Sequence, residues 1–325
     1  MMIERLKNLL NDDSLVLKEN VQTLWSGYGQ IVRVFSQSRS TNFIVKAIAP
    51  DKNISHPRGW QSATGHERKL ISYQVELAFY ENYAALCTAN CRVADLIAVE
   101  KTSKDTLLVL EDLDAAGFKL RYEDGNDKTL FAAIKWLANF HALFMFNSGA
   151  SLWPIGSYWH LATRPDEWHN MPDNEYKRSA EVIDLALNNA RYKTLIHGDA
   201  KFANLCFHEN EQDVAAVDFQ YVGVGSPVKD LMYLLGSCLD DKQLFEYSDK
   251  AVNFYLSSLK NALSTNKLFD LQEWQNLEQE FWKLYPVAWA DFYRFLIGWN
   301  PDSWKICNFM AQQAELGLTH AMAQA

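Results

Sequence analysis

A short segment near the middle of the chain, LIHGDAKFANLCF at residues 195–207, carries residue types that suit phosphoryl transfer. Asp199 follows His197 by two positions, and Asn204 follows Asp199 by five. This H-x-D-x-x-x-x-N spacing is that of a phosphoryl-transfer catalytic loop, and the apolar residues around it predict short flanking strands. Asp218 ends a second apolar run 14 residues after Asn204. This order predicts Asp199 as the acceptor of a hydroxyl proton, and Asn204 and Asp218 as oxygen ligands of Mg²⁺.

Two further residues upstream supply the charges that such a reaction needs. A γ-phosphoryl group in transit carries several negative charges, so a catalyst needs a divalent metal and a fixed cation near the α- and β-phosphates. Lys46, within the apolar run FIVKAIA, is predicted to hold phosphate oxygens, and Glu76 to pair with Lys46 and fix its position. Lys201 is predicted as a second cation near the γ-phosphate. The set predicts a phosphotransferase that uses ATP and Mg²⁺.

The elements that must position these residues change character along the chain. Apolar β-prone runs separated by turns cover residues 21–50 and 91–113, and a helical pattern covers residues 67–86 between them. This β-β-β-α-β-β order predicts an antiparallel sheet with one helix packed on it. From Asp127 onward the pattern is mostly helical, except for a strand-rich window at residues 193–221. The fold class is therefore α+β.

Two lobes follow from this division. The predicted N-terminal lobe, residues 1–113, is small and rich in β-structure, and the predicted C-terminal lobe, residues 114–325, is larger and mostly helical. A hinge is predicted at about residues 111–117. A cleft between two such lobes is the default place for a ligand.

Four segments together resemble a known family: HGDAKFAN, VDFQYVGVGSPVKDLMYLL, LVLEDL and RKLISYQVELAFY. They are similar to the ecdysteroid-kinase-like branch of the choline kinase and aminoglycoside phosphotransferase group, which has the bilobal protein-kinase-like fold. The resemblance covers nearly the whole chain. It implies a catalytic role for Asp199, metal binding by Asn204 and Asp218, and a phosphate-side pair of Lys46 and Glu76.

The same resemblance implies where the nucleotide binds. In the hinge segment LVLEDL, backbone groups of Glu111 and Leu113 would pair with adenine. Gly27 and Gly29 would belong to the loop that covers the phosphates. This loop departs from the full glycine-rich signature, because it holds only these two glycines.

Two alternatives to a small-molecule kinase are a protein kinase and a nucleotide-binding scaffold. A protein kinase needs a long activation segment, but only eight residues separate Asp218 from Pro227 and no A-P-E follows. The acceptor is therefore predicted to be a small alcohol. The second alternative is a catalytically silent nucleotide-binding scaffold of the same fold. The presence of all the metal and lysine positions favours the enzyme.

Aromatic residues with isolated charges fill two C-terminal segments, residues 153–168 and 284–304. They predict a pocket for the acceptor, which stays open between choline, an aminoglycoside-like sugar, a sterol-like alcohol and another metabolite. The candidate contact residues are Tyr158, Trp159, Trp289, Asp291 and Arg294. Packing in the core is the other interpretation of these aromatics, and pairing with Arg294 is the preferred one for Asp291.

Three other polar residues are predicted to have structural roles. His197 is expected to brace the catalytic loop through hydrogen bonds. His141 lies on an apolar helical stripe and is expected to be a core histidine with satisfied hydrogen bonds. Asp230, on the helix that follows the glycines, is expected to bond to the backbone of the catalytic loop.

Composition excludes several other classes of protein. The 325 residues include 31 Lys and Arg against 40 Asp and Glu, a formal net charge of −9, which disfavours nucleic-acid binding. Five cysteines without a dense spacing pattern favour a reducing cytosol, so a cytoplasmic location is predicted. The N-terminal sequence lacks the apolar run of a signal peptide, and no segment reads as a membrane span.

Overall fold

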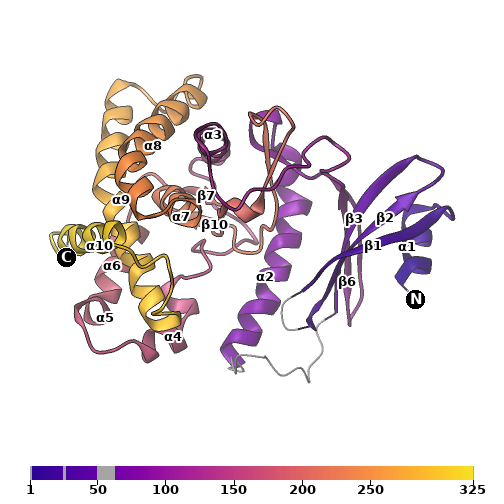
Figure 1. The fold of residues 1–325 in the computed structure, drawn as a ribbon, viewed down its shortest axis with the longest axis horizontal. Coiled ribbons are helices and arrows are strands. Elements are labelled where there is room, and N and C mark those ends of the chain that lie inside the picture. Colours follow the sequence, from indigo (N-terminus) through magenta and orange to yellow (C-terminus); the bar gives the residue numbers. More distant parts are fainter. Residues whose placement is uncertain (1, 25–26, 50–62, 325) are drawn as a thin grey trace.

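The computed structural model describes residues 2–24, 27–49 and 63–324 (Figure 1). A β-sheet with its helices forms one side of the molecule, and the helical remainder of the chain forms the other (Figure 1). The elements of the sheet side, in chain order, are α1 (Met2–Leu10), β1 (Leu15–Thr23), β2 (Gly29–Ser36), β3 (Thr41–Ile48), α2 (Ala63–Asn82), β4 (Arg92–Val93), β5 (Leu96–Lys101) and β6 (Thr106–Glu111).

Five of these strands form one antiparallel sheet in the order β1-β2-β3-β6-β5. β1 and β2 form an antiparallel pair, and β3 lies at the centre of the sheet between β2 and β6. Lys46 therefore lies on the central strand, opposite Ile31 of β2 and Leu108 of β6. A position with partners on both sides holds the lysine backbone firmly.

The sheet has a helix on each face (Figure 1). Side chains alternate between the faces along β6. Leu108 and Leu110 pack in the cluster that includes α2, whereas Val109 packs with Leu6 and Leu10 of α1. The sequence patterns predicted one helix against this sheet, and α1 is an additional one. Its apolar residues recur with helical spacing, but the segment is only nine residues long.

The segment at residues 91–100, predicted as one strand, is divided between two sheets. β5 joins the five-stranded sheet, whereas the two-residue β4 runs parallel to β9 of the helical side. β9 also pairs with β8 in an antiparallel ladder. This three-stranded sheet connects the end of the N-terminal part to the segment that precedes Asp218.

The helical side contains the remaining elements. In chain order they are α3 (Asp127–Leu143), α4 (Pro165–Asn170), α5 (Glu175–Arg178), α6 (Ala180–Asn188), β7 (Thr194–Ile196), β8 (Leu205–Phe207), β9 (Val214–Ala216), β10 (Gly223–Gly225), α7 (Val228–Cys238), α8 (Asp241–Ala262), α9 (Leu271–Trp299) and α10 (Asn308–Met322). α3 begins at Asp127 as predicted, because Asn126 and Thr129 form a reciprocal capping box. No helix in the described ranges is both long and apolar enough to cross a membrane.

Packing of the helical side produces one large apolar cluster, to which α2 also contributes. α9 packs along α10 and α3 packs along α8. Phe79 of α2 stacks on Phe219 with ring centroids 3.9 Å apart. This contact places α2 directly against the segment that carries Asp218.

The packing of α1 gives a test of the fold. Leu6 is fully buried, whereas Leu17 of the edge strand β1 is 55% exposed. We expect Leu6→Ala to lower the free energy of unfolding by about 2–5 kcal/mol, because the deleted methyl groups leave a cavity. The matched change Leu17→Ala should stay within about 0.5 kcal/mol of wild type. Chemical denaturation of both variants measures the difference, and equal effects would contradict the packing of α1 on the sheet.

Candidate active site

The predicted catalytic loop lies between β7 and β8 and folds around Asp199. The side-chain amide of Asn204 donates to the carbonyl of Asp199 at 2.9 Å and to its Oδ2 at 3.1 Å. Lys201 Nζ lies 3.1 Å from the same Oδ2. The side chain of Asp199 is 10% exposed. The loop therefore holds this carboxylate in one orientation with two donors on one oxygen.

Asp230 of α7 holds the first residues of this loop by their backbone. Its carboxylate accepts from the N–H of His197 at 2.6 Å and from the N–H of Gly198 at 2.9 Å. It also lies 3.2 Å from Nε2 of His141, whose Nδ1 lies 2.8 Å from the hydroxyl of Tyr255. The predictions that Asp230 bonds to the loop and that His141 is a satisfied core residue are both confirmed.

Gly198 allows this loop to approach the next segment closely. Its φ angle is +77°, and an added Cβ would lie 2.1 Å from the carbonyl oxygen of Tyr221. Any other residue would be strained and would clash with backbone. His197 braces the same region, because its Nε2 donates to the carbonyl of Val217 at 3.0 Å and its Nδ1 accepts from the N–H of Asp199 at 3.3 Å. The predicted bracing role of His197 is confirmed.

Lys46 connects the sheet to the helical side. Its Nζ lies 2.6 Å from Oε2 of Glu76 on α2 and 3.8 Å from Oδ1 of Asp218. Burial raises the pKa of Glu76, and the charge of Lys46 offsets only part of that effect. Burial also acts to raise the pKa of Asp218, but Lys46, Lys69 and Lys201 together lower it. Asp218 is therefore held as a carboxylate.

The residues predicted to bind Mg²⁺ fit a hard cation. Oδ1 of Asp218 is buried and has no hydrogen-bond partner among the described residues. Asn204 uses its amide nitrogen on Asp199, which leaves its amide oxygen as an acceptor. Mg²⁺ commonly takes one or two protein oxygens and completes its shell with water and phosphate oxygens. No group of three or more His, Cys, Asp or Glu suited to a metal is found in the described ranges, so an all-protein metal cage is not present there.

The predicted nucleotide loop has the geometry that its glycines suggest. Gly29 has a φ of +139°, and an added Cβ would lie 1.9 Å from the carbonyl oxygen of Ala47. Gly27, with a φ of +70°, lies in the preceding turn. The neighbouring Ser26 lies outside the described residues. Gly29 and Ala47 thus bring the turn close to the strand that carries Lys46.

The hinge segment is fixed to the sheet by a buried ion pair. Nε of Arg33 on β2 lies 2.7 Å from Asp112, which is 2% exposed. The carboxylate of Glu111 accepts from Arg92 and from the N–H of Asp95, so this side chain is engaged within the protein. The N–H of Leu113 donates to no described residue, whereas its carbonyl accepts from Phe118 at 2.8 Å. The Leu113 N–H thus remains available to a ligand.

Most of the predicted acceptor contacts are in the core. Four of the five predicted contact residues are at most 1% exposed, namely Trp159, Trp289, Asp291 and Arg294. Asp291 accepts from Arg294 at 2.5 Å and from Nε1 of Trp159 at 2.9 Å, as the pairing interpretation predicted for Arg294. Although burial acts to raise the pKa of Asp291, Arg294 and then Lys229 lower it. Trp159, Asp291 and Arg294 thus form a buried network rather than an open pocket wall, and Trp289 is buried in the core.

Tyr158 differs from these four because it is partly exposed and lies near Asp199. Burial raises its pKa, and the negative charge of Asp199 raises it further. Tyr233 of α7 shows the same two effects and packs against Tyr158 with ring centroids 5.4 Å apart. The two tyrosines therefore lie within electrostatic range of the Asp199 carboxylate.

Sequence reasoning missed three residues near the site: Lys69, Tyr233 and Lys305. Lys69 donates to Gln220 at 2.6 Å, and its charge contributes to lowering the pKa of Asp218. The sequence spacing could have indicated Lys69, because it precedes Glu76 by seven residues and so lies on the same helical face. Tyr233 likewise follows Asp230 by three positions on α7. Lys305 gave no such signal, since it lies between helices.

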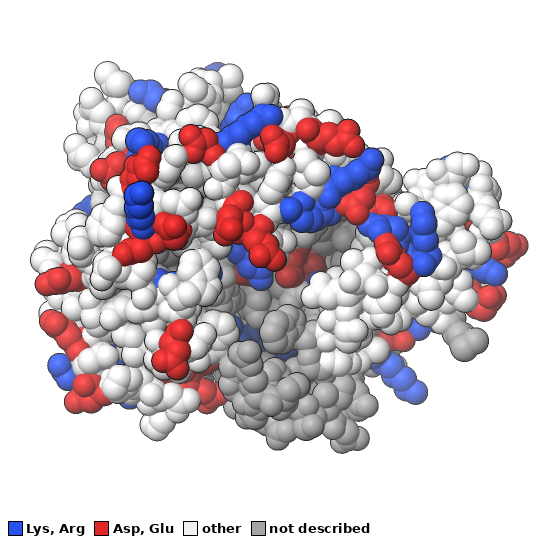
Figure 2. All heavy atoms as spheres, viewed as in Figure 1, with Lys and Arg blue, Asp and Glu red and all other residues white. Residues whose placement is uncertain are grey.

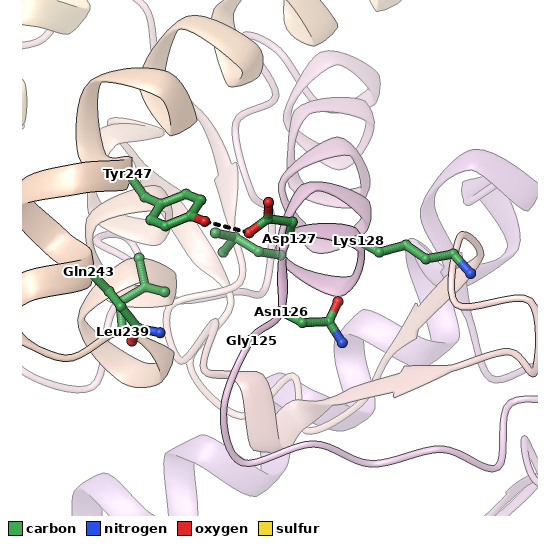
Figure 3. A pocket seen from close by; sticks show the side chains of 8 residues that line it. Gly125, Asn126, Asp127, Lys128, Leu239, Gln243 and Tyr247 are labelled. Carbon is green, nitrogen blue, oxygen red and sulfur yellow. Dashed lines mark hydrogen bonds between the residues drawn. The ribbon is translucent and has the colours of Figure 1, made fainter.

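Charged side chains of both signs gather around a hollow between the sheet side and the helical side (Figure 2). A separate cavity of 530 Å³ lies where α3 and α8 begin (Figure 3). It is crossed by a 2.6 Å hydrogen bond from Tyr247 to Asp127, and none of the predicted site residues lines it. The candidate site is therefore defined by the catalytic-loop geometry and not by this cavity.

This geometry agrees with the sequence comparison. Residues 158–268 match the ecdysteroid kinase-like family. The matched segment contains the catalytic loop, Asp218 and Asp230, so the resemblance inferred from the motifs is confirmed there. A comparison with curated proteins finds no match for the chain.

Solved structures with a similar fold include three small-molecule kinases. An ethanolamine kinase of Plasmodium vivax has 15% sequence identity and a TM-score of 0.53, with 99% of this chain and 85% of that chain covered. An amicoumacin kinase in complex with AMP-PNP and Ca²⁺ has 11% identity and a TM-score of 0.49, with 100% and 93% covered. An aminoglycoside phosphotransferase of Streptomyces rimosus in complex with ADP and streptomycin has 12% identity and a TM-score of 0.43, with 88% and 99% covered. The fold is α+β and protein-kinase-like.

The contacts of Asp230 predict a pH-dependent stability. Burial acts to raise the pKa of Asp230, but the hydrogen bond and charge of His141 and the backbone donor of Gly198 lower it. A lowered folded-state pKa contributes stability above the unfolded value of about 3.9, and this contribution is lost as the pH falls further. We expect Asp230→Asn to lower the free energy of unfolding by about 2–4 kcal/mol at neutral pH.

Chemical denaturation at pH 7 and at about pH 3 measures this effect. The difference in free energy of unfolding between wild type and Asp230→Asn should be smaller at the acid pH. Asp249→Asn, at an exposed position on α8, is the matched control and should follow wild type at both values. A gap that is constant with pH would contradict an ionised Asp230.

Proposed function

We propose that the chain is an ATP- and Mg²⁺-dependent phosphotransferase that acts on a hydroxyl group of a small organic molecule. The observation that carries this proposal is the junction of Lys46, Glu76 and Asp218, formed by residues from three separate segments. Asp199 and Asn204 lie in the adjoining catalytic loop. Similarity to the ecdysteroid kinase-like family and the fold shared with an ethanolamine kinase support the proposal.

The nucleotide side of this proposal uses the sheet. Lys46 would bind oxygens of the α- and β-phosphates, and Glu76 would keep the ammonium in place between substrate turnovers. Gly27 and Gly29 would let the turn between β1 and β2 approach the phosphates. The carbonyl of Glu111 and the N–H of Leu113 would pair with adenine. We propose residues 1–113 as the nucleotide lobe on this basis, and residues 114–325 as the catalytic and acceptor lobe.

The metal side uses two oxygen donors. Asn204 and Asp218 would hold Mg²⁺, which would neutralise charge on the β- and γ-phosphate oxygens. The lowered pKa of Asp218 keeps its carboxylate charged for this role. Lys201 would add a positive charge next to the γ-phosphate, since it lies beside Asp199 and its own charge also reaches Asp218.

Asp199 would act on the acceptor. Its carboxylate would accept a hydrogen bond from the acceptor hydroxyl and orient the oxygen toward the γ-phosphorus. The new oxygen–phosphorus bond forms as the bond to ADP breaks, and the hydroxyl proton passes to Asp199. Asn204 and Lys201 fix the carboxylate during this step through their contacts with Oδ2. Direct in-line transfer needs no phosphorylated enzyme.

Removal of the proposed base tests the catalytic role of Asp199. We expect Asp199→Asn to lower kcat by about 10²–10⁴-fold, because the amide cannot accept the proton, while the shape of the loop is kept. ATP consumption against a library of small alcohols measures the effect. Asp249→Asn is the control and should keep wild-type turnover. If Asp199→Asn phosphorylated an acceptor as fast as the wild-type protein does, Asp199 would not be the base.

Thermal unfolding with ligands tests the metal site separately. A nucleotide at about 100 times its Kd adds about 2.7 kcal/mol of stability, so ATP with Mg²⁺ should raise the Tm of wild type. Asp218→Ala should abolish the part of this rise that depends on Mg²⁺. The silent scaffold alternative predicts the same rise without turnover. Absence of any response to millimolar nucleotide would contradict both the enzyme and the scaffold.

A further inference from the structure

Lys305 lies in the connection between α9 and α10 and has an unusual set of neighbours. Its Nζ lies 4.6 Å from the centroid of the Tyr233 ring, 5.7 Å from that of Phe292 and 5.8 Å from that of Trp304. The structure records no ion pair between Lys305 and a carboxylate in the described part of the chain. A lysine ammonium surrounded by three ring faces occupies an environment that favours organic cations. We call Tyr233, Phe292 and Trp304 the aromatic box.

The aromatic box borders the candidate catalytic loop. Tyr233 is the nearest ring to Lys305, and the charge of Asp199 is one of the causes that raise the pKa of this tyrosine. Burial lowers the pKa of Lys305 to about 8, with Asp199 acting to raise it and Lys201 acting to lower it. Tyr158 connects the box to the catalytic loop, because its N–H donates to the carbonyl of Gly198 at 3.1 Å and its ring centroid lies 5.4 Å from that of Tyr233. The box is therefore on the acceptor side of the proposed site.

Ring faces beside a carboxylate would suit an alcohol that carries an ammonium group, but Lys305 already fills the box with an ammonium of its own. A second cation there would meet repulsion from Lys305 and from Lys201, and it would lose the ring faces that Lys305 covers. An uncharged alcohol would meet no such repulsion. The aliphatic stem of Lys305 would instead offer it apolar contact.

We propose that Lys305 occupies a cation-binding box beside Asp199 and thereby restricts the acceptor to alcohols without a positive charge. This inference rests on the proposed function and deepens it, because it names the acceptor class. In this proposal Lys305 occupies the place that a cationic substrate would take. Lys305 is therefore a specificity-determining residue. Removal of the lysine side chain should therefore open the box to a cation.

Direct binding tests the box without relying on catalysis. Isothermal titration with choline should give about tenfold tighter binding to Lys305→Ala than to wild type, the range expected when ring faces become available to a cation. Lys250→Ala is the matched control, because Lys250 lies 5.0 Å from the Tyr247 ring on exposed α8. It should bind choline as wild type does.

A second substitution guards against a change of fold as the cause. Trp304 is 63% exposed, so Trp304→Leu removes one wall of the box with little effect on the core. Added to Lys305→Ala, it should reverse most of the gain in choline affinity. Equal choline binding by wild type and Lys305→Ala, or a gain that Trp304→Leu leaves untouched, would overturn the proposal.

Competition between two acceptors supplies the catalytic readout. Choline and 3,3-dimethyl-1-butanol have the same shape, but only choline is charged. The ratio of their kcat/KM values should rise about tenfold in Lys305→Ala. Turnover with an unchanged ratio and unchanged binding would overturn the box proposal and leave the proposed function standing. A shift in choline binding without turnover of any alcohol would support the box and contradict the proposed function.

Discussion

The buried carboxylate of Asp230 is the interaction on which the arrangement of the site depends. A charge without exposure to water is tolerated only when hydrogen bonds satisfy it, and Asp230 obtains them from His197, Gly198 and His141. These donors come from the catalytic loop and α3, so α7 holds both elements through one side chain. The close approach at Gly198 then sets the distance between the catalytic loop and the segment after Asp218. The position of Asp199 follows from this framework.

The proposed phosphate site lies in a chain whose net charge is −9. This net charge would repel phosphate groups, so the proposed phosphate binding would depend on cations placed locally. Lys46, Lys69 and Lys201 come from three different segments and jointly lower the pKa of Asp218. Each lysine is paired with a carboxylate or an amide, which keeps the long side chains in place. The sheet, α2 and the catalytic loop must therefore pack together before this set of charges exists.

The same residue types have different roles outside the cleft. Asp291, Arg294 and Trp159 resemble a ligand-binding set in the sequence, yet Asp291 accepts hydrogen bonds from the other two in the core. Lys305 has no such pattern around it in the sequence, yet it lies among rings contributed by α7, α9 and its own loop. Helical spacing shows which side chains share a face. It does not show whether that face meets another helix or an open site.

Local patterns predicted the loop around Asp199, a strand with Lys46 and the start of α3, because each depends on neighbours within a few residues or on regular spacing. The same patterns give Asn204 and Asp218 as the proposed metal donors. They also predicted that His141, on an apolar helical stripe, is a core histidine with satisfied hydrogen bonds, and that Asp230, on the helix after the glycines, bonds to the loop backbone. Only the tertiary structure decided the packing of α1 on the sheet, the division between β4 and β5, the burial of Asp291 and the position of Lys305. Burial and charge environment depend on partners far away in the sequence, and those partners are brought together only by folding.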